Sequence, residues 1–271
     1  MIEAVGANMV LASASGADLP GVNDFLPPEI LFQGTPFAIN RIILIRIVAT
    51  ILLLIILGLT AARAKLIPGR WQGLIEFGMD FVRNSVVYET MGELRGKRYV
   101  PMITTLFFTI FFFNLFGVIP GANMAATATI TMPLVFAIWV LVQYWVAACR
   151  EKGLWGYIRD ECFTPGVPWP VYILLAPIQL LELVIIRPAS LTIRLFANMI
   201  SGHLTVATCL AFAQFWMIES ANKMVGIPVG AAWFLGGIVM TLFEVFVAFL
   251  QAYVFSILAT VYINLSYPEA E

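Results

Sequence analysis

The sequence predicts an all-α integral membrane protein with about five membrane-crossing helices and one amphipathic interfacial helix. In this prediction the last two long helices form a tilted antiparallel hairpin. The composition is 61% hydrophobic and 11% charged, with a mean hydropathy of +0.93, whereas soluble domains have about 45–50% apolar and about 25% charged residues. The net charge of -1 and the absence of a basic patch indicate no nucleic-acid partner.

Five apolar segments reach the roughly 20 residues that a helix needs to cross the hydrocarbon core. Residues 1–40 are polar by comparison and lack a basic start followed by an apolar core, so we expect no cleaved signal peptide. The sequence therefore predicts a polar N-terminal extension over 1–40 and a single transmembrane domain over 41–271. The five segments are 42–62, 101–119, 131–148, 170–218 and 228–266.

Residues 71–92 have a different pattern, because apolar residues recur at every fourth position and charged residues lie on another face. This pattern predicts an amphipathic helix at the membrane surface. A solvated helix within a loop fits the periodicity about equally well. The apolar face comprises Leu74, Gly78, Val82 and Val86, and the charged residues are Glu76, Asp80 and Arg83.

The basic residues predict the orientation. They gather in the loop after the first segment and in the loop after the third, whereas residues 1–40 contain none and the last loop contains only Lys223. By the positive-inside rule, the N-terminus lies outside and the C-terminus in the cytoplasm. The basic residues of the two loops are Arg63, Lys65, Arg70, Arg83, Arg95, Lys97 and Arg98, then Arg150, Lys152 and Arg159.

The segment 170–218 is too long for one upright crossing, since as a helix it would extend about 73 Å. Either it crosses twice, with a break near Pro177 or Pro188, or it is one steeply tilted helix. If it forms an antiparallel hairpin with 228–266, residues whose numbers add to nearly the same total lie at the same depth. Three polar pairs meet this condition: Arg194 with Gln251, His203 with Glu244, and Glu182 with Asn264.

Helical geometry separates these polar residues into two environments. At 100° per residue, Asn198, Ser201 and Thr205 fall within about 40° of Arg194 and form a polar stripe. His203 falls about 180° from Arg194, on the opposite face and about 13.5 Å along the axis.

Arg194 stays protonated and therefore supplies a fixed positive charge. It could alternatively be a structural charge capped by Gln251 and Asn198. His203 and Glu244 can both titrate, which favours a proton-accepting pair in an aqueous inlet, although a hydrogen-bonded structural pair has the same pattern. Glu182 is a candidate for a separate outlet. Arg187, next to Pro188, is interpreted as a structural residue able to snorkel to the interface.

The cysteines do not form a metal-binding pattern. Cys149, Cys162 and Cys209 are scattered, without a CxxC motif or a neighbouring histidine cluster. The sequence also has no glycine loop of the kind that holds a phosphate. We therefore expect no metal and no cofactor.

Three motifs give the sequence a family resemblance. They are RLFANMISGHL at 194–204, FEVFVAFLQAYVF at 243–255 and FNLFGVIPG at 113–121. With the five-segment layout, the chain from about Phe25 onward resembles subunit a of the membrane sector of F-type ATP synthases.

The resemblance implies a non-catalytic stator that works against a rotating ring of c subunits beside b-type peripheral stalk subunits and membrane lipid. Arg194 would face the ring carboxylate, with Asn198 and Gln251 nearby. Protons, the ion we expect, would enter past His203 and Glu244 and leave near Glu182. Some relatives carry the glutamate and histidine of the inlet exchanged, and in some the outlet acid stands two positions earlier.

A stand-alone ion-coupled secondary transporter is the alternative function. Such transporters commonly have inverted repeats and broken helices, and no internal repeat is visible here. The acidic N-terminal region without an arginine-rich transit segment favours a bacterial plasma membrane.

Overall fold

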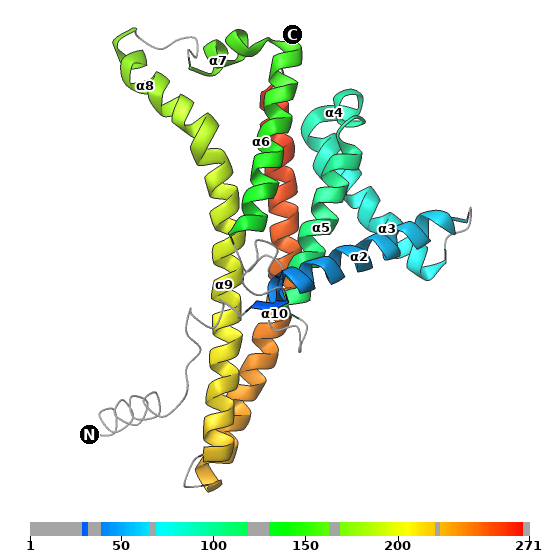
Figure 1. The fold of residues 1–271 in the computed structure, drawn as a ribbon, viewed down its shortest axis with the longest axis vertical. Helices are drawn as coiled ribbons and strands as arrows, with labels where there is room; N and C mark the ends of the chain where they lie inside the picture. Colours follow the sequence, from blue (N-terminus) through cyan, green and yellow to red (C-terminus); the bar gives the residue numbers. More distant parts are fainter. Residues whose placement is uncertain are drawn as a thin grey trace.

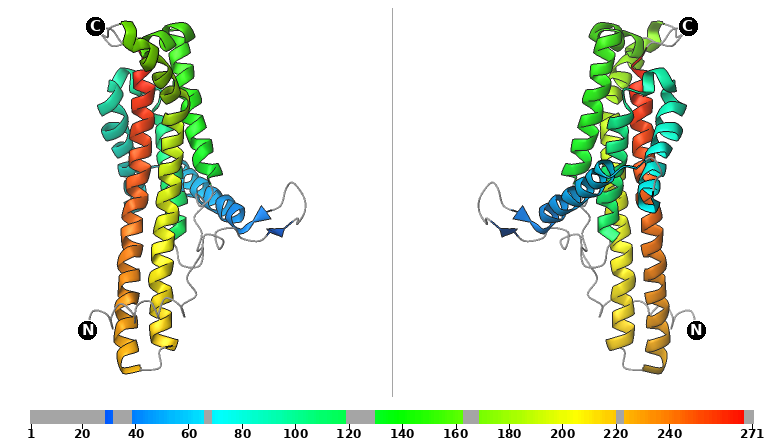
Figure 2. Two further views of the ribbon diagram at one scale, coloured as in Figure 1. Left: turned by 90° about the vertical axis from the view of Figure 1, so that its left-hand side faces the viewer. Right: turned by 90° about the vertical axis from the view of Figure 1, so that its right-hand side faces the viewer.

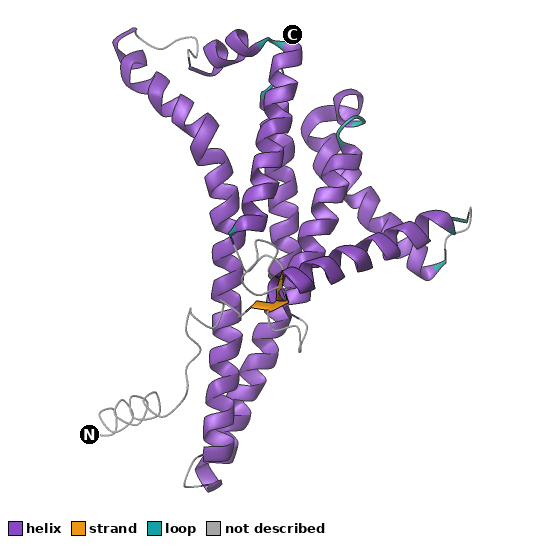
Figure 3. Cartoon of the chain, in the orientation of Figure 1, coloured by secondary structure: helices purple, strands orange, loops and turns teal. Residues whose placement is uncertain are grey.

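The computed structural model describes residues 29–31, 39–65, 69–118, 130–162, 169–219 and 223–267. Most of the predicted extension 1–40, the loop residues 120–129 and the turn just before Lys223 lie outside the described residues. The described chain is helical apart from a short antiparallel hairpin, β1 (Glu29–Leu31) with β2 (Ile39–Asn40), and a few turn residues (Figure 3). The all-α membrane fold class is confirmed.

The described chain contains five helical stretches that are long and apolar enough to cross a membrane, as predicted. The elements that form them are α2 (Arg41–Ala62), α5 (Val100–Val118), α6 (Thr131–Glu151), the continuous run α8 (Trp169–Leu181), η3 (Glu182–Ile186), α9 (Arg187–Gln214) and η4 (Phe215–Glu219), and α10 (Lys223–Leu265). The segments named η are π-helical turns. The short α7 (Leu154–Cys162) joins α6 to α8.

The fourth stretch is one long helix rather than two crossings. It continues from Leu174 to Ile218 over 45 residues, with Pro177 inside α8 and Pro188 in the first turn of α9. This length corresponds to about 67 Å, against a hydrocarbon core of about 30 Å. In Figure 1 the shorter α2 runs across the direction of α9 and α10. The geometry therefore favours an upright α2 with a steeply inclined α9–α10 pair.

The antiparallel pairing of α9 with α10 is confirmed, and the two helices lie side by side in both views of Figure 2. Glycines on α10 allow the close approach: a Cβ at Gly230 would lie 3.0 Å from the carbonyl oxygen of Ala213. Small residues commonly bring membrane helices together in this way. The register agrees with the sequence, since Gly202 contacts Glu244 and Gly237 faces Cys209.

The third polar pair, Glu182 with Asn264, is not joined by a hydrogen bond. The Asn264 side-chain amide donates to the carbonyl of Thr90, with 3.1 Å between nitrogen and oxygen. Glu182 instead lies 3.6 Å from the guanidinium of Arg187. The reason is that the helices separate at this end, where α8 bends away from α10 (Figure 1) and α6 packs against both α9 and α10.

The predicted amphipathic helix consists of α3 (Arg70–Phe81), the π-helical η2 (Val82–Tyr88) and α4 (Glu89–Gly96). Val82 and Val86 are fully buried, and a Cβ at Gly78 would lie 3.0 Å from the Phe108 ring. Leu74 does not belong to this buried face, because it is 63% exposed.

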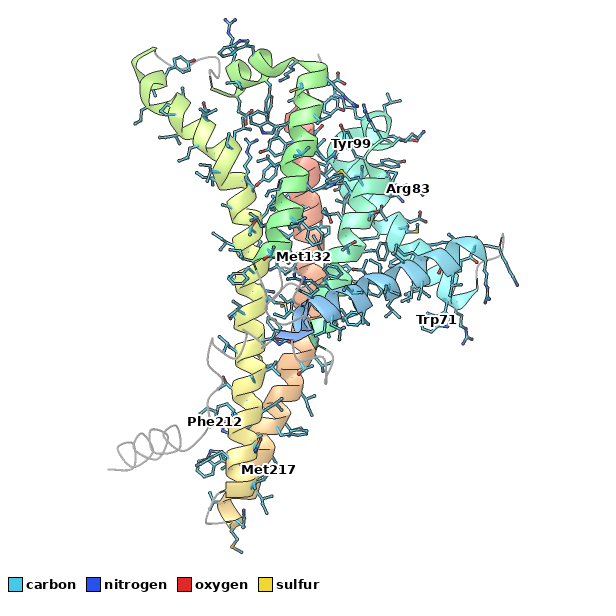
Figure 4. All side chains as sticks on the ribbon, viewed as in Figure 1. Trp71, Arg83, Tyr99, Met132, Phe212 and Met217 are labelled. Atoms are coloured by element: carbon cyan, nitrogen blue, oxygen red, sulfur yellow. The ribbon has the colours of Figure 1, made fainter. Side chains whose placement is uncertain are left out.

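The second half of this region is part of the protein core rather than a helix lying free on a surface. The Phe81 ring centre lies 5.9 Å from that of Phe249 and 5.8 Å from that of Tyr253, both on α10. In contrast, α3 extends outward to the exposed Trp71 (Figure 4).

The core that holds α9 and α10 in place is formed by α5, α6 and η2 packed against them. Fully buried large residues include Ile103 and Ile110 of α5, Val140 and Tyr144 of α6, and Leu191 of α9. The face of α10 toward this core carries the buried small residues Ala248, Ala252, Ser256, Ala259 and Thr260. Small side chains let α10 approach its neighbours closely, which leaves the polar residues of α9 at the edge of the core.

Candidate functional site

A cavity of about 120 Å³ with a partly polar lining lies where α5, α9 and α10 meet. Its polar lining comes from all three helices: Asn114 of α5, Asn198, Ser201 and Thr205 of α9, and Glu244 of α10. The structure thus brings together three residues of the predicted α9 stripe and the glutamate of α10. Since liquid water occupies about 30 Å³ per molecule, the cavity has room for a few water molecules.

The local fold of α9 explains why these residues face the cavity. Asn198, Ser201 and Thr205 recur at three- and four-residue intervals, so they form one stripe beside the buried face of Leu191, Leu195 and Met199. The Thr205 hydroxyl donates to the carbonyl of Ser201 at 2.8 Å. Its donor is therefore used within the helix, and its oxygen lone pairs remain available to the cavity.

Glu244 lies directly against Gly202. A Cβ at position 202 would overlap the Glu244 carboxylate, so the Glu244 side chain would have to move to make room for it. The carboxylate oxygen Oε1 is buried and accepts no hydrogen bond from any described residue. A buried carboxylate oxygen without a protein donor is costly, and water in the adjoining cavity would satisfy it.

His203 stays at the level of Glu244, as predicted, because the contact of Glu244 is with the preceding residue, Gly202. However, the structure does not bring the two side chains together in one cavity. The half-buried imidazole of His203 is absent from the cavity lining, and its Nε2 is buried elsewhere. Glu244 therefore shares its cavity with Asn198, Ser201 and Thr205, the polar residues that lie on the same face of α9 as Arg194.

Arg194 is exposed on the surface of α9, one turn from Asn198. It makes no ion pair or hydrogen bond with any described residue. Neither Asn198 nor the half-buried Gln251 caps it, although both lie nearby in the pairing of the helices. An arginine at a membrane-helix centre costs about 2.5–3.5 kcal/mol on insertion scales, and no described residue offsets that cost at Arg194.

A second polar cluster, around Arg187, was not predicted. The prediction that Arg187 snorkels to the interface is wrong, because the residue is only 8% exposed. Its guanidinium forms an ion pair with Glu161 of α7, and its Nε lies 3.6 Å from a carboxylate oxygen of Glu182. The guanidinium carbon also lies 5.3 Å from the centre of the Tyr262 ring of α10.

Sequence spacing does not predict this cluster. Glu182 and Arg187 are five residues apart, about 140° around an α-helix, and the π-helical turn η3 brings their charges to 3.6 Å. Glu161 belongs to another element, and a tertiary contact brings it in. Tyr157 of α7 lies next to the cluster, and burial raises the pKa of its phenol, so the hydroxyl remains neutral. Among the described residues, no three His, Cys, Asp or Glu side chains gather to hold a metal ion.

Comparisons with known proteins agree with the resemblance. Residues 42–264 match the family model described as ATP synthase A chain. The ATP synthase subunit a of Rhodococcus erythropolis is 34% identical over 249 residues, which cover 91% of this chain and 89% of that protein. The corresponding subunit of Streptomyces lividans is 32% identical over 250 residues, covering 92% and 87%. That of Hyphomonas neptunium is 36% identical over 208 residues, covering 76% and 78%.

Proposed function

The chain belongs to the ATP synthase A chain family, and from this premise we propose that it supplies two offset proton half-channels to a rotating ring of c subunits. In this role the protein makes and breaks no covalent bond to a substrate. It loads and unloads the carboxylates of the ring and so couples proton flow to ATP synthesis elsewhere in the complex.

The exposed charge of Arg194 carries this proposal. A membrane helix that presents an arginine without a partner in the described chain fits a carboxylate presented by a neighbouring subunit. Arginine cannot release its proton under physiological conditions. It therefore stabilises the ionised form of a passing carboxylate and repels a proton that would pass straight between the half-channels.

The cavity beside Glu244 supports an outer half-channel. Polar groups of Asn198, Ser201 and Thr205 line a space large enough for water next to the carboxylate. A proton delivered there would neutralise a ring carboxylate, and the neutral site could then move through lipid at much lower cost than an ion. We propose that His203 completes the inlet from the opposite face of α9 and that Gln251 lies beside the ring contact.

Glu182 is proposed for the cytoplasmic outlet, about three helical turns before Arg194 on the same continuous helix. We propose that this end of α9 lies in the cytoplasmic half, with the N-terminus outside, the C-terminus inside and residues 41–271 as one membrane domain, an orientation that the basic loops favour. We propose that the assembly lies in a bacterial plasma membrane, with b-type stalk subunits and lipid around it.

The test is Arg194→Ala in inverted membrane vesicles that contain the whole complex. We expect ATP-driven proton pumping to be lost and the passive proton leak to rise, while the amount of assembled complex stays unchanged. Arg83→Ala is a matched control, because Arg83 pairs at 2.9 Å with Asp80 on an exposed surface. Normal pumping by Arg194→Ala would reject the proposal and favour the transporter alternative.

A further inference from the structure

Arg187 connects three separate parts of the protein. It is the first residue of α9, and its guanidinium reaches Glu161 on α7, Glu182 on the π-helical turn η3 and the ring of Tyr262 on α10. Figure 1 shows α7 lying between the ends of α6 and α8, above the start of α9. Through one side chain, the beginning of α9 is therefore tied to a connecting helix and to its antiparallel partner.

The direction of Arg187 is coupled to that of Arg194 by helical geometry. Both residues belong to α9, which has no break between them. They are separated by about two turns, so they differ by only about 20° around the axis and about 10.5 Å along it. Any rotation of the start of α9 that moves Arg187 therefore turns Arg194 by a similar angle.

The turn before Arg187 allows α9 to rotate about its axis relative to α8. Residues Glu182–Ile186 form a π-helical turn, and the backbone N–H of Arg187 donates to the carbonyl of Glu182, five residues earlier. A π-helical turn spaces its hydrogen bonds more widely than an α-helix, and such turns occur mostly as single insertions. The α-helix before the turn therefore does not by itself set the rotation of the helix after it.

We propose that Arg187, held by Glu161, is a positioning residue that fixes the rotation of α9 and thereby the direction in which Arg194 points. This inference rests on the function proposed above for Arg194. Glu161 is the principal anchor, because Nη2 of Arg187 donates to it whereas Nε and Nη1 are buried and donate a hydrogen bond to no described residue. Removal of Glu161 would leave a buried cation with only a longer contact to Glu182.

Charge exchange tests the proposal in the assembled complex. Arg187→Glu and Glu161→Arg each place like charges together, and the double variant restores an opposite pair with its ends exchanged. We expect each single variant to lower ATP-driven pumping by about tenfold or more and the double variant to recover most of it, as coupled neighbours do in a double-mutant cycle. Lys97→Glu is the control, because Lys97 pairs with Glu93 on an exposed surface and should leave pumping unchanged.

A second measurement reports the rotation of α9 directly. Cysteines are introduced one at a time at exposed Ala197 and at buried Met199, after the native Cys149, Cys162 and Cys209 are replaced by alanine. A membrane-permeant maleimide should label position 197 much faster than position 199 in the parent. We expect the ratio of the two rates to fall in Arg187→Glu and to return in the double variant, whereas a role limited to assembly would leave it unchanged.

The outcomes separate this inference from the proposed function. If both single variants lose pumping but keep the labelling ratio of the parent, or if the double variant recovers nothing, Arg187 does not position α9. If Arg194→Ala pumps normally while the labelling ratio still responds to charge exchange, the function proposed for Arg194 fails and the control of helix rotation stands.

Discussion

The two arginines of α9 occupy opposite environments although they lie on nearly the same side of one helix. Arg187 is buried and paired with Glu161 of the same chain, whereas Arg194 is exposed and has no partner among the described residues. One end of the helix therefore satisfies its charge internally. The middle of the helix carries a charge that no described residue pairs with, which supports the role proposed for Arg194.

This difference separates structural charge from functional charge in a membrane protein. A buried ion pair adds little net stability, but breaking it leaves an uncompensated charge at a large cost. An exposed arginine contributes nothing to the packing of its own chain and persists at a cost in the membrane. The first kind of residue should therefore control folding, whereas the second, under the proposed function, should control the interaction with the c-subunit ring.

The largest expected effect comes from removing each charge in turn. Arg187→Met should lower the free energy of unfolding by about 3–5 kcal/mol, because Glu161 loses its buried partner. Arg194→Met should change it by less than about 1 kcal/mol, because the side chain is exposed and no ion pair or hydrogen bond with a described residue is lost. Denaturant unfolding of the purified subunit in detergent measures both values.

One result would contradict the contrast between Arg187 and Arg194. Equal destabilisation by both substitutions would mean that Arg194 is held within its own chain. Arg83→Met serves as the reference, since the exposed pair with Asp80 should contribute about 0–1 kcal/mol.

A second prediction concerns Gly202, further along the same helix, where the contact with Glu244 determines whether a larger side chain is tolerated. Gly202→Ala would place a methyl group against the Glu244 carboxylate, and we expect a loss of about 1–3 kcal/mol in stability together with slower proton uptake. Gly236→Ala on α10 is the matched control, because no atom lies within 4 Å of a Cβ there. The same thermal shift in both variants would contradict the packing of Glu244 on Gly202.

The sequence predicted the elements of this fold because their physical signals are local. The lengths of the apolar segments predicted the five spans. The register of α9 with α10 followed from the rule that residues at the same depth of an antiparallel hairpin have numbers with the same sum, and the contact of Gly202 with Glu244 confirms it. The polar stripe of Asn198, Ser201 and Thr205 also follows from helical spacing alone, and the structure places all three on one cavity.

Prediction from the sequence failed where the partner of a side chain is set by a tertiary contact with another element. Asn264 pairs with the backbone of Thr90 because α4 is docked there, and no local pattern reports that docking. Arg187 is buried because α7 supplies Glu161 from another part of the chain. Periodicity likewise could not show that the apolar stretch around Val86 joins the core while Leu74 remains exposed.

The smallest effect tests how firmly α6 holds the π-helical turn before Arg187. The Tyr144 hydroxyl donates to the carbonyl of Leu183 at 2.5 Å, and both residues are fully buried. Tyr144→Phe removes the donor and leaves that carbonyl unsatisfied, so we expect a loss of about 1 kcal/mol in unfolding free energy. Tyr88→Phe, on η2, should change the stability far less, because its hydroxyl makes no hydrogen bond with a described residue. If Tyr144→Phe leaves the stability at the parent value, the ion pair of Arg187 alone secures the start of α9, and the contrast between its two arginines becomes sharper.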